Sequence, residues 1–213
     1  MVQPLRPSSM ANPSVLESVI TYLNDRTLAC PPSSAIVTAL LEQERAAKTN
    51  QFRYCYSDLL GTWRLSWVTG TRKAQNRSGI VLGKGRFLPT WLQISLTYGI
   101  ESTSSTDLSV PTEPSELTER GVVYNRVQWA GSQLQLSGPT QLHHQRILGF
   151  DFNHLTLHLG NWQLLNRGIG KPTESFYQSP LKKQAFFTYF WITDQAIAAR
   201  GRGGGLAIWF RGK

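Results

Sequence analysis

The sequence predicts a mainly β protein: a closed antiparallel β-barrel of about eight to ten strands that follows an N-terminal helical hairpin. Three observations predict this fold. Apolar residues recur at helical spacing up to about Thr49, and from Leu59 onward they alternate with polar residues almost to the C-terminus. Glycine-rich turn signals separate the alternating runs. No run of helical length interrupts them, so we expect hairpin-linked strands that close on themselves and leave no free edge.

Residues 13–50 predict the helical hairpin. Asn12-Pro13-Ser14 supplies a cap and a proline suited to a first turn, and Cys30-Pro31-Pro32 breaks the first helix before the second begins. Each helix carries an apolar stripe, formed by Val15, Leu16, Val19, Ile20 and Leu23 in the first and by Ile36, Val37, Leu40 and Leu41 in the second. Because both stripes must be covered, we expect the hairpin to pack on the barrel.

The strands follow from alternation with a period of two. In residues 62–68, Trp63, Leu65 and Trp67 are expected to share one face. The same pattern recurs at 92–98, 123–129, 134–136 and 155–159, and two last strands at 185–193 and 206–211 flank a shorter run at 196–200. Each pattern is typical of a strand with one buried face.

The predicted organisation is a single core. Residues 1–12 are expected to be a flexible N-terminus, 13–50 the helical hairpin, and 51–213 the barrel domain. Within the barrel domain, residues 101–119 are rich in Ser, Thr and Pro and carry five acids and no base. We expect a mobile surface loop there.

Length and composition exclude several classes. A chain of 213 residues with 40% hydrophobic residues suits one sizeable folded domain. No run approaches the roughly 18 apolar residues of a membrane-spanning helix. The N-terminus lacks the apolar core of a signal peptide, so we do not expect secretion. Two cysteines, Cys30 and Cys55, cannot make a disulfide framework, and free thiols are expected.

The charge is strongly basic, with 22 Lys and Arg against 13 Asp and Glu. Such a cationic body suits an anionic surface, whether lipid, nucleic acid or protein. A basic belt is predicted to face an anionic membrane, although a merely solvated face is equally compatible with it. Its members are Arg72, Lys73, Arg77, Lys84, Arg86, Lys171, Lys182 and Lys183.

The first predicted strand opens with Gly61-Thr62-Trp63. A glycine at this position lets a large indole swing across the end of a small barrel. In lipocalin-like barrels such a Trp commonly stacks on an Arg of the closing strand, for which Arg200 and Arg211 are the candidates. We therefore predict a barrel-closing group of Gly61, Trp63, Arg200 and Gly201.

The ending adds an aromatic strand, an acidic turn and a glycine hairpin, Phe187 to Gly204. Together with the Gly61-x-Trp63 opening after a helical segment, it resembles the plastid lipid-associated protein family, the plant fibrillins, in a cyanobacterial-type member. The resemblance covers about Leu59 to Arg211. Ile197 and Arg202 depart from the family pattern, which usually has Arg and Asp there. The resemblance implies a lipocalin-like barrel, peripheral to a thylakoid membrane on its cytoplasmic face or in the plastid stroma, that binds or shields apolar isoprenoid-type molecules without established catalytic residues.

Seven aromatic side chains are expected to point inward and contact a ligand: Trp63, Trp67, Tyr98, Trp129, Phe187, Tyr189 and Trp191. They could bury an isoprenoid, carotenoid, quinone or acyl lipid. Barrels of this size are also often filled by their own side chains, so a ligand cavity and a solid core both remain open.

Other chemistries find little support. On an extended strand, His154 and His158 lie about 13 Å apart, and adjacent His143 and His144 point to opposite faces, so neither pair chelates one metal. Cys30 and Cys55 lack a nucleophile signature, and Gly83-Lys84-Gly85 lacks the rest of a phosphate loop. We expect no enzyme activity, no cofactor and no nucleic-acid partner.

The leading hypothesis is a non-catalytic protein that binds or shields an apolar molecule beside a thylakoid-type membrane. Two alternatives remain. One is a scaffold or assembly factor that docks on a membrane protein complex of photosynthesis, and the other is a chaperone for a linear tetrapyrrole (bilin).

Overall fold

The computed structural model of the chain describes residues 14–70, 85–100 and 119–211. The expected flexible N-terminus, residues 101–118 of the expected acidic loop, and four members of the basic belt (Arg72, Lys73, Arg77 and Lys84) lie outside these ranges. In chain order the elements are α1 (Val15–Asn24), α2 (Ser33–Thr49), the 3₁₀ helix η1 (Tyr56–Leu59), β1 (Gly61–Val68), β2 (Arg86–Phe87), β3 (Gln93–Ile100), β4 (Arg120–Trp129), β5 (Ser132–His143), β6 (Ile147–Phe150), β7 (His154–Leu159), β8 (Trp162–Gly168), α5 (Thr173–Tyr177), η2 (Leu181–Lys183), β9 (Ala185–Ile192), β10 (Ala196–Gly201) and β11 (Leu206–Phe210).

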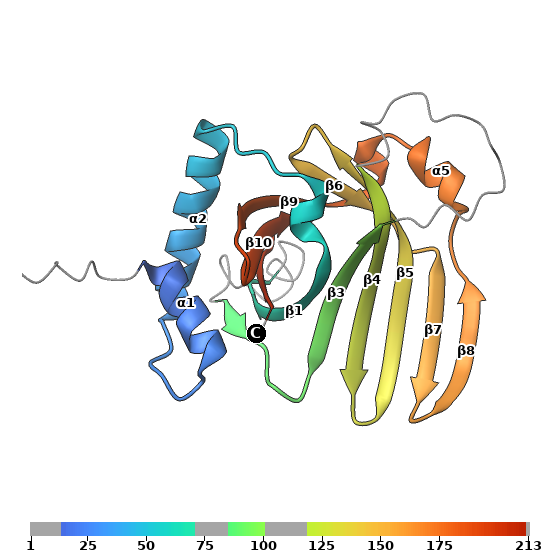
Figure 1. Cartoon of the computed structure of the whole chain (residues 1–213), viewed down its shortest axis with the longest axis horizontal. Coiled ribbons are helices and arrows are strands. Elements are labelled where there is room, and N and C mark those ends of the chain that lie inside the picture. Colours follow the sequence, from blue (N-terminus) through green and yellow to red (C-terminus); the bar gives the residue numbers. More distant parts are fainter. Residues whose placement is uncertain (1–13, 71–84, 101–118, 212–213) are drawn as a thin grey trace, which may run out of the picture.

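Eight antiparallel strands close into a barrel, which confirms the predicted fold class. Their order is β4, β3, β1, β11, β10, β9, β6 and β5, and β5 pairs again with β4. Figure 1 shows β1, β9 and β10 curving around the centre of the molecule, while β3, β4 and β5 form a broad wall. The short strand β2 adds to β1 outside this cycle.

The sheet divides at β5. Ser132 to Gln141 of β5 pair with β4, but along the other edge of β5 only Thr140 to His143 pair with β6, whereas Ser132 to Ser137 pair with β7. The division falls at Gly138-Pro139. A Cβ on Gly138 would lie 2.3 Å from the carbonyl oxygen of Asp151, so glycine lets the backbone near Asp151 pass close to β5. Pro139 has no backbone N–H to donate to a neighbouring strand. As a result, β7 and β8 continue the barrel wall as an extension (Figure 1).

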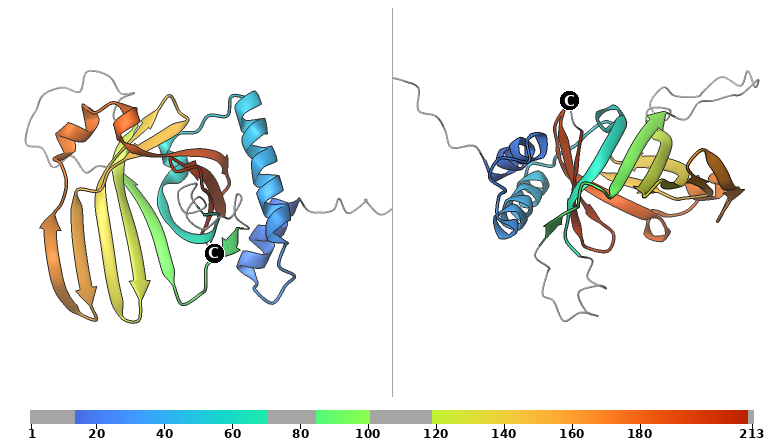
Figure 2. Two further views of the ribbon diagram at one scale, coloured as in Figure 1. Left: turned by 180° about the vertical axis from the view of Figure 1, so that it is seen from behind. Right: turned by 90° about the horizontal axis from the view of Figure 1, so that it is seen from below.

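The N-terminal helices pack on the outside of the barrel, as the sequence predicted. Ser14 and Glu17 form a reciprocal capping box at the start of α1. The apolar stripes meet the outer faces of the last strands in a helix-side core, whose buried members are Leu16, Val19, Leu23, Ile36, Leu40, Trp67, Phe190, Ala196, Ala198, Leu206, Ile208 and Phe210. Figure 2 shows both helices on the side of the barrel opposite β7 and β8.

Arg211, and not Arg200, stacks on the barrel-closing indole. The Arg211 guanidinium carbon lies 3.8 Å from the centroid of the Trp63 ring. Gly61, at φ 103°, makes room for this group, because a Cβ there would lie 3.2 Å from an Arg211 nitrogen. The prediction of Arg200 in this role is wrong, since Arg200 forms an ion pair with Glu44 of α2 and thereby ties the helices to β10. Gly201 ends β10 next to the Phe187 ring.

Two β-bulges move two of the predicted inward tryptophans to the outer face. In β1, the register shifts between Leu65 and Trp67, so Leu65 pairs with Trp209 of the barrel interior but Trp67 pairs with Ile208 of the helix-side core. In β9, an extra residue likewise separates Tyr189 from Trp191. The expectation that Trp67 and Trp191 face the barrel interior is therefore wrong: both pack against the helix-side core.

Candidate functional site: an open apolar face beside a filled barrel

The barrel interior is filled by its own side chains. Trp63, Tyr98 and Tyr189 are 1–2% exposed, and their neighbours include Trp209, Leu96, Leu142 and Leu148. The hydroxyls of Tyr98 and Tyr189 share a hydrogen bond of 2.7 Å, and the Trp63 indole N–H donates to the Leu59 carbonyl at 2.7 Å. We call this set the barrel core. Its aromatic contacts favour a solid interior around Trp63, Tyr98 and Tyr189.

Burial determines the pKa of the buried tyrosine hydroxyls in the barrel core. The pKa of Tyr54, Tyr98 and Tyr189 is raised above the ordinary value of 10, chiefly because burial penalises the phenolate. These phenols stay neutral at physiological pH. The Tyr98 and Tyr189 hydroxyls hydrogen-bond to each other, whereas the Tyr54 hydroxyl is buried without a hydrogen-bond partner in the described chain.

The structure separates the seven aromatic residues that the sequence grouped as a ligand site. Trp63, Tyr98 and Tyr189 lie in the barrel core, and Phe187 packs against it. Phe187 also stacks on Phe150, with ring centroids 4.8 Å apart. Trp129, by contrast, is 60% exposed at the end of β4. Together with the outward Trp67 and Trp191, the seven do not form one pocket.

A different apolar surface lies on the wall that leaves the barrel. Five residues, one from each of β3, β4, β5, β7 and β8, pair directly across the sheet in one row: Ile94, Val127, Leu134, Leu157 and Leu165. Paired residues of an antiparallel sheet point to the same face. Leu96 and Tyr98 follow Ile94 in β3 at alternate positions and belong to the barrel core. The row therefore continues the inner face of the barrel wall.

This inner face is apolar but lies outside both cores. None of the five residues in the row belongs to the barrel core or the helix-side core of the described chain, or packs against either. Four of them are half-buried and Leu165 is 37% exposed. A second apolar pair, Leu136 and Leu155, lies beside the row on the same face. We call the row and this pair the open face.

The opposite side of the same strands is polar. Gln93, Gln128, Gln133, His158 and Gln163 form the matching cross-strand row. The Gln128 side-chain amide donates to the Gln133 side chain at 2.9 Å, and Arg126 donates to Gln135 at 3.0 Å. The wall is therefore an amphipathic sheet, and its polar side suits water while its apolar side requires a cover.

The sequence predicted that these leucines lie on strands, but it did not predict that they form a site. The alternation in β5 and β7 predicted one buried face, which is only partly correct because the face is half-buried. What reveals the site is that β7 and β8 pair outside the barrel. The two leucines of β8 carry a further signal, since Leu164 and Leu165 stand adjacent in a strand that is exposed along its whole length.

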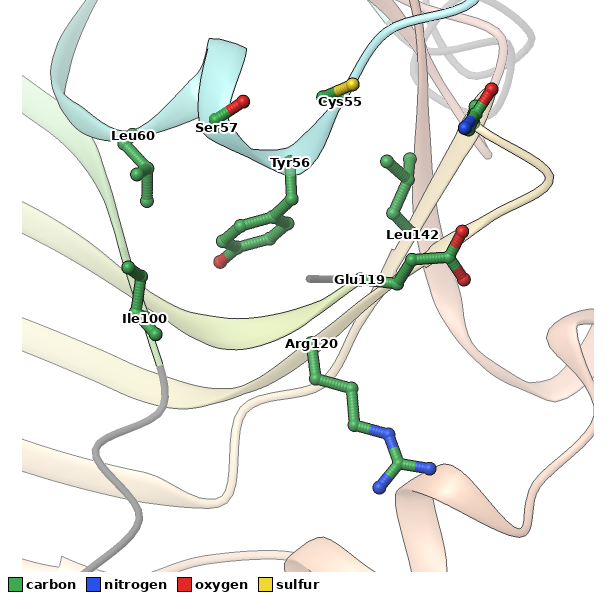
Figure 3. A pocket seen from close by; sticks show the side chains of 9 residues that line it. Cys55, Tyr56, Ser57, Leu60, Ile100, Glu119, Arg120 and Leu142 are labelled. Carbon is green, nitrogen blue, oxygen red and sulfur yellow. The ribbon is translucent and has the colours of Figure 1, made fainter. Parts of the chain in front are cut away.

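A pocket of about 420 Å³ lies beside η1 and adjoins the barrel core, of which its lining residues Tyr56 and Leu142 are members (Figure 3). It is lined by Cys55, Tyr56, Ser57, Leu60, Ile100, Glu119, Arg120, Leu142 and Gln145. Tyr56 is held there by its hydroxyl, which donates to the Gly99 carbonyl at 3.0 Å and accepts from Thr140 at 2.9 Å. Ile100 and Glu119 flank residues 101–118, which the structure does not describe, so we assign this pocket no ligand.

Arg86, Lys171, Lys182 and Lys183 of the predicted basic belt are exposed. Arg86 lies on β2, and the two adjacent lysines lie on η2. With the other four members outside the described ranges, the belt stays a prediction.

In the described ranges, no group of three or more His, Cys, Asp or Glu side chains is arranged to hold a metal ion. His143 has a lowered pKa, mainly because of its burial. Cys30 and Cys55 are free thiols, as the sequence predicted, and both are exposed. Among the described helices, none is long and apolar enough to cross a bilayer.

Comparisons of the chain with models of known protein families, with curated proteins and with solved structures find no match. The resemblance to the plant fibrillins stays a prediction.

Proposed function

We propose that this protein binds an elongated apolar molecule, of the lipid, isoprenoid or pigment class, without catalysis, and that the molecule lies on the open face. One observation carries the proposal: five strands align five apolar side chains in a row that neither core of the described chain covers. A ligand that covered ~300 Å² of apolar surface would gain roughly 7 kcal/mol before the cost of immobilising it. That gain suits reversible binding.

The proposal moves the ligand away from the residues that the sequence favoured. In the barrel core, the aromatic rings contact each other and the Tyr98 and Tyr189 hydroxyls satisfy each other. On the open face, by contrast, the leucines of β5 and β7 are half-buried, and within the described ranges they pack against neither core. The apolar row is also long, which suits an extended chain better than a compact ring.

Titration with a fluorescent polyene fatty acid tests the proposal. Leu134→Ala and Leu157→Ala should each weaken binding on the order of tenfold, because each removes about three buried carbons of contact surface. Thr156→Ala and Gln133→Ala are matched controls, since they neighbour these leucines in the same strands but point to the polar face. Equal affinity in all four variants and in the unmodified protein would overturn the proposal.

A second candidate function is docking on a protein complex, which the free edge of β8 favours. Among the strands that the structure describes, β8 pairs with β7 alone, and it is exposed throughout, so a partner strand could add to it. The organic extract of protein purified from a pigment-containing host separates the candidates. A bound carotenoid, quinone or lipid supports the first proposal, a bilin supports the chaperone alternative, and an empty extract with co-purifying subunits supports docking.

A further inference from the structure

Three exposed tryptophans stand at neighbouring turns of the amphipathic wall. Trp91 precedes β3, Trp129 ends β4, and Trp162 begins β8, and these side chains are 64%, 60% and 77% exposed. The chain has seven tryptophans in total, and the other four are buried or half-buried. We call these three the tryptophan rim.

The sheet register places the rim along one edge. Trp129 pairs with Ser132, Ser132 with Leu159, and Leu159 with Trp162, so the turns β4–β5 and β7–β8 lie side by side. Trp91 lies near Trp129, because both line one shallow hollow, whose other lining residues include Gln93, Gln128 and Gln133 of the polar side. Figure 1 shows the start of β3 and both turns along the lower edge of the wall.

The residue type and its exposure point to a lipid interface. An indole has a large apolar ring and one N–H donor, and it is enriched at the level of lipid headgroups, where one side is wet and the other apolar. Scattered single apolar residues on a surface need no explanation, but three indoles on three adjacent turns form a patch.

The charge around the rim is complementary to an anionic surface. The rim turns and the strand segments beside them, residues 85–98, 122–136 and 155–167, contain no Asp or Glu, and they carry Arg86 and Arg126 close to the rim and Arg167 at the far end of β8. Basic residues close to an anionic bilayer are attracted to it, and no carboxylate of these segments opposes that attraction.

The rim is continuous with the open face. The pair Leu159 and Trp162 is followed along the same two strands by Leu157 and Leu165 of the apolar row. An apolar molecule that left a membrane at the rim would therefore reach the open face without crossing bulk water.

We propose that the tryptophan rim inserts into the headgroup layer of an anionic lipid membrane and turns the open face toward it. The docking step stands independently of the bound molecule, whereas the transfer of a ligand onto the open face rests on the proposed function. In this account the rim, more than the basic belt, fixes the protein's orientation on the membrane.

Co-sedimentation with vesicles of phosphatidylcholine and about 30% phosphatidylglycerol tests the docking. The triple variant Trp91→Ala, Trp129→Ala, Trp162→Ala should bind on the order of 100-fold more weakly than the unmodified protein, because binding scales with the apolar area inserted. Ile100→Ala is the matched control: Ile100 is 66% exposed at the opposite end of β3, and its replacement should leave binding within about twofold.

Vesicles whose acyl chains carry bromine give a second readout. They should quench tryptophan emission of the unmodified protein, and this quenching should disappear in the triple variant, whose remaining tryptophans lie in the cores or beside α1. If the triple variant fails to fold, Trp162→Ala alone decides, since a side chain that is 77% exposed has little structural role, and it should weaken binding about tenfold.

Three results would overturn the inference: unchanged vesicle binding in the triple variant, absence of bromine quenching, or a solution dimer that Trp162→Ala dissociates while vesicles bind neither protein. The last result would assign the rim to a second copy of the chain. Vesicle binding without polyene binding would leave the docking intact and remove the proposed function. Polyene binding without vesicle binding would leave the proposed function intact and remove the docking.

Discussion

The filled end of the barrel and its open wall share strands, yet they differ in what covers their apolar side. In β3, Leu96 and Tyr98 are 5% and 2% exposed in the barrel core, while Ile94, two residues earlier on the same face, lies outside it. Strand alternation is the same throughout, but the cover changes where β5 exchanges β6 for β7. Alternation thus determines which side of a strand is apolar, and topology determines whether that side becomes core or surface.

The largest expected effect compares one substitution in the two regions. Trp63→Ala should lower the free energy of unfolding by about 3–5 kcal/mol, because it leaves a cavity in the barrel core and removes the stacking partner of Arg211. Trp162→Ala should change it by less than about 0.5 kcal/mol, since that side chain is 77% exposed. Urea denaturation followed by circular dichroism measures both. Similar losses in the two variants would break the comparison.

The next effect concerns the buried phenols. Tyr98→Phe should cost about 1–3 kcal/mol, because it leaves the Tyr189 hydroxyl buried without its partner. Tyr124→Phe, a half-buried position on the polar side of β4, should cost less. Denaturation at neutral pH is the measurement, and a larger loss for Tyr124→Phe than for Tyr98→Phe would contradict a solid core.

Alkaline pH acts on the same phenols. Because the folded-state pKa of Tyr54, Tyr98 and Tyr189 is raised above 10, the unfolded chain releases these protons first. Stability is therefore full below about pH 10 and falls as pH rises beyond it. Phenolate absorbance should show these three tyrosines ionising only as the protein unfolds, whereas a gradual titration of all seven in the folded state would indicate an open, hydrated barrel.

The helix-covered outer face gives an intermediate case. Glu44→Gln should cost about 1 kcal/mol, because the ion pair with Arg200 is about three-quarters buried and is made through two hydrogen bonds. Glu42→Gln, at an exposed position of the same helix, should cost less than about 0.5 kcal/mol. Equal stability of the two variants would mean that apolar packing alone holds the helices on the barrel.

The smallest effect is expected on the open face. Leu134→Gln should change the free energy of unfolding by less than about 1 kcal/mol, since its side chain packs against neither core. The same replacement at Leu96, in the barrel core, should cost several times more. If Leu134→Gln lowered the free energy of unfolding as much as the replacement of Leu96, the open face would have to be covered in solution.

The sequence predicted the barrel, the helix pair and the Gly61-Trp63 closure because each has a local signature. Apolar periodicity, helix caps and turn residues are all encoded by residues close together in the sequence, and they were sufficient to predict these three features. The bulges in β1 and β9 escaped prediction, since one extra residue leaves the alternation of Trp63, Leu65 and Trp67 looking regular. The open face and the tryptophan rim escaped as well, because they depend on which distant strands pair with β5.

Photolabelling with a diazirine-bearing fatty acid, followed by mass spectrometry, tests most directly whether an apolar molecule lies on the open face. We predict that the label attaches to peptides of β4, β5 and β7, within residues 122–136 and 154–159, and that excess unlabelled fatty acid competes with it. Labelling confined to β1 and β11, within residues 61–68 and 206–210, would place the ligand inside the barrel and contradict this account.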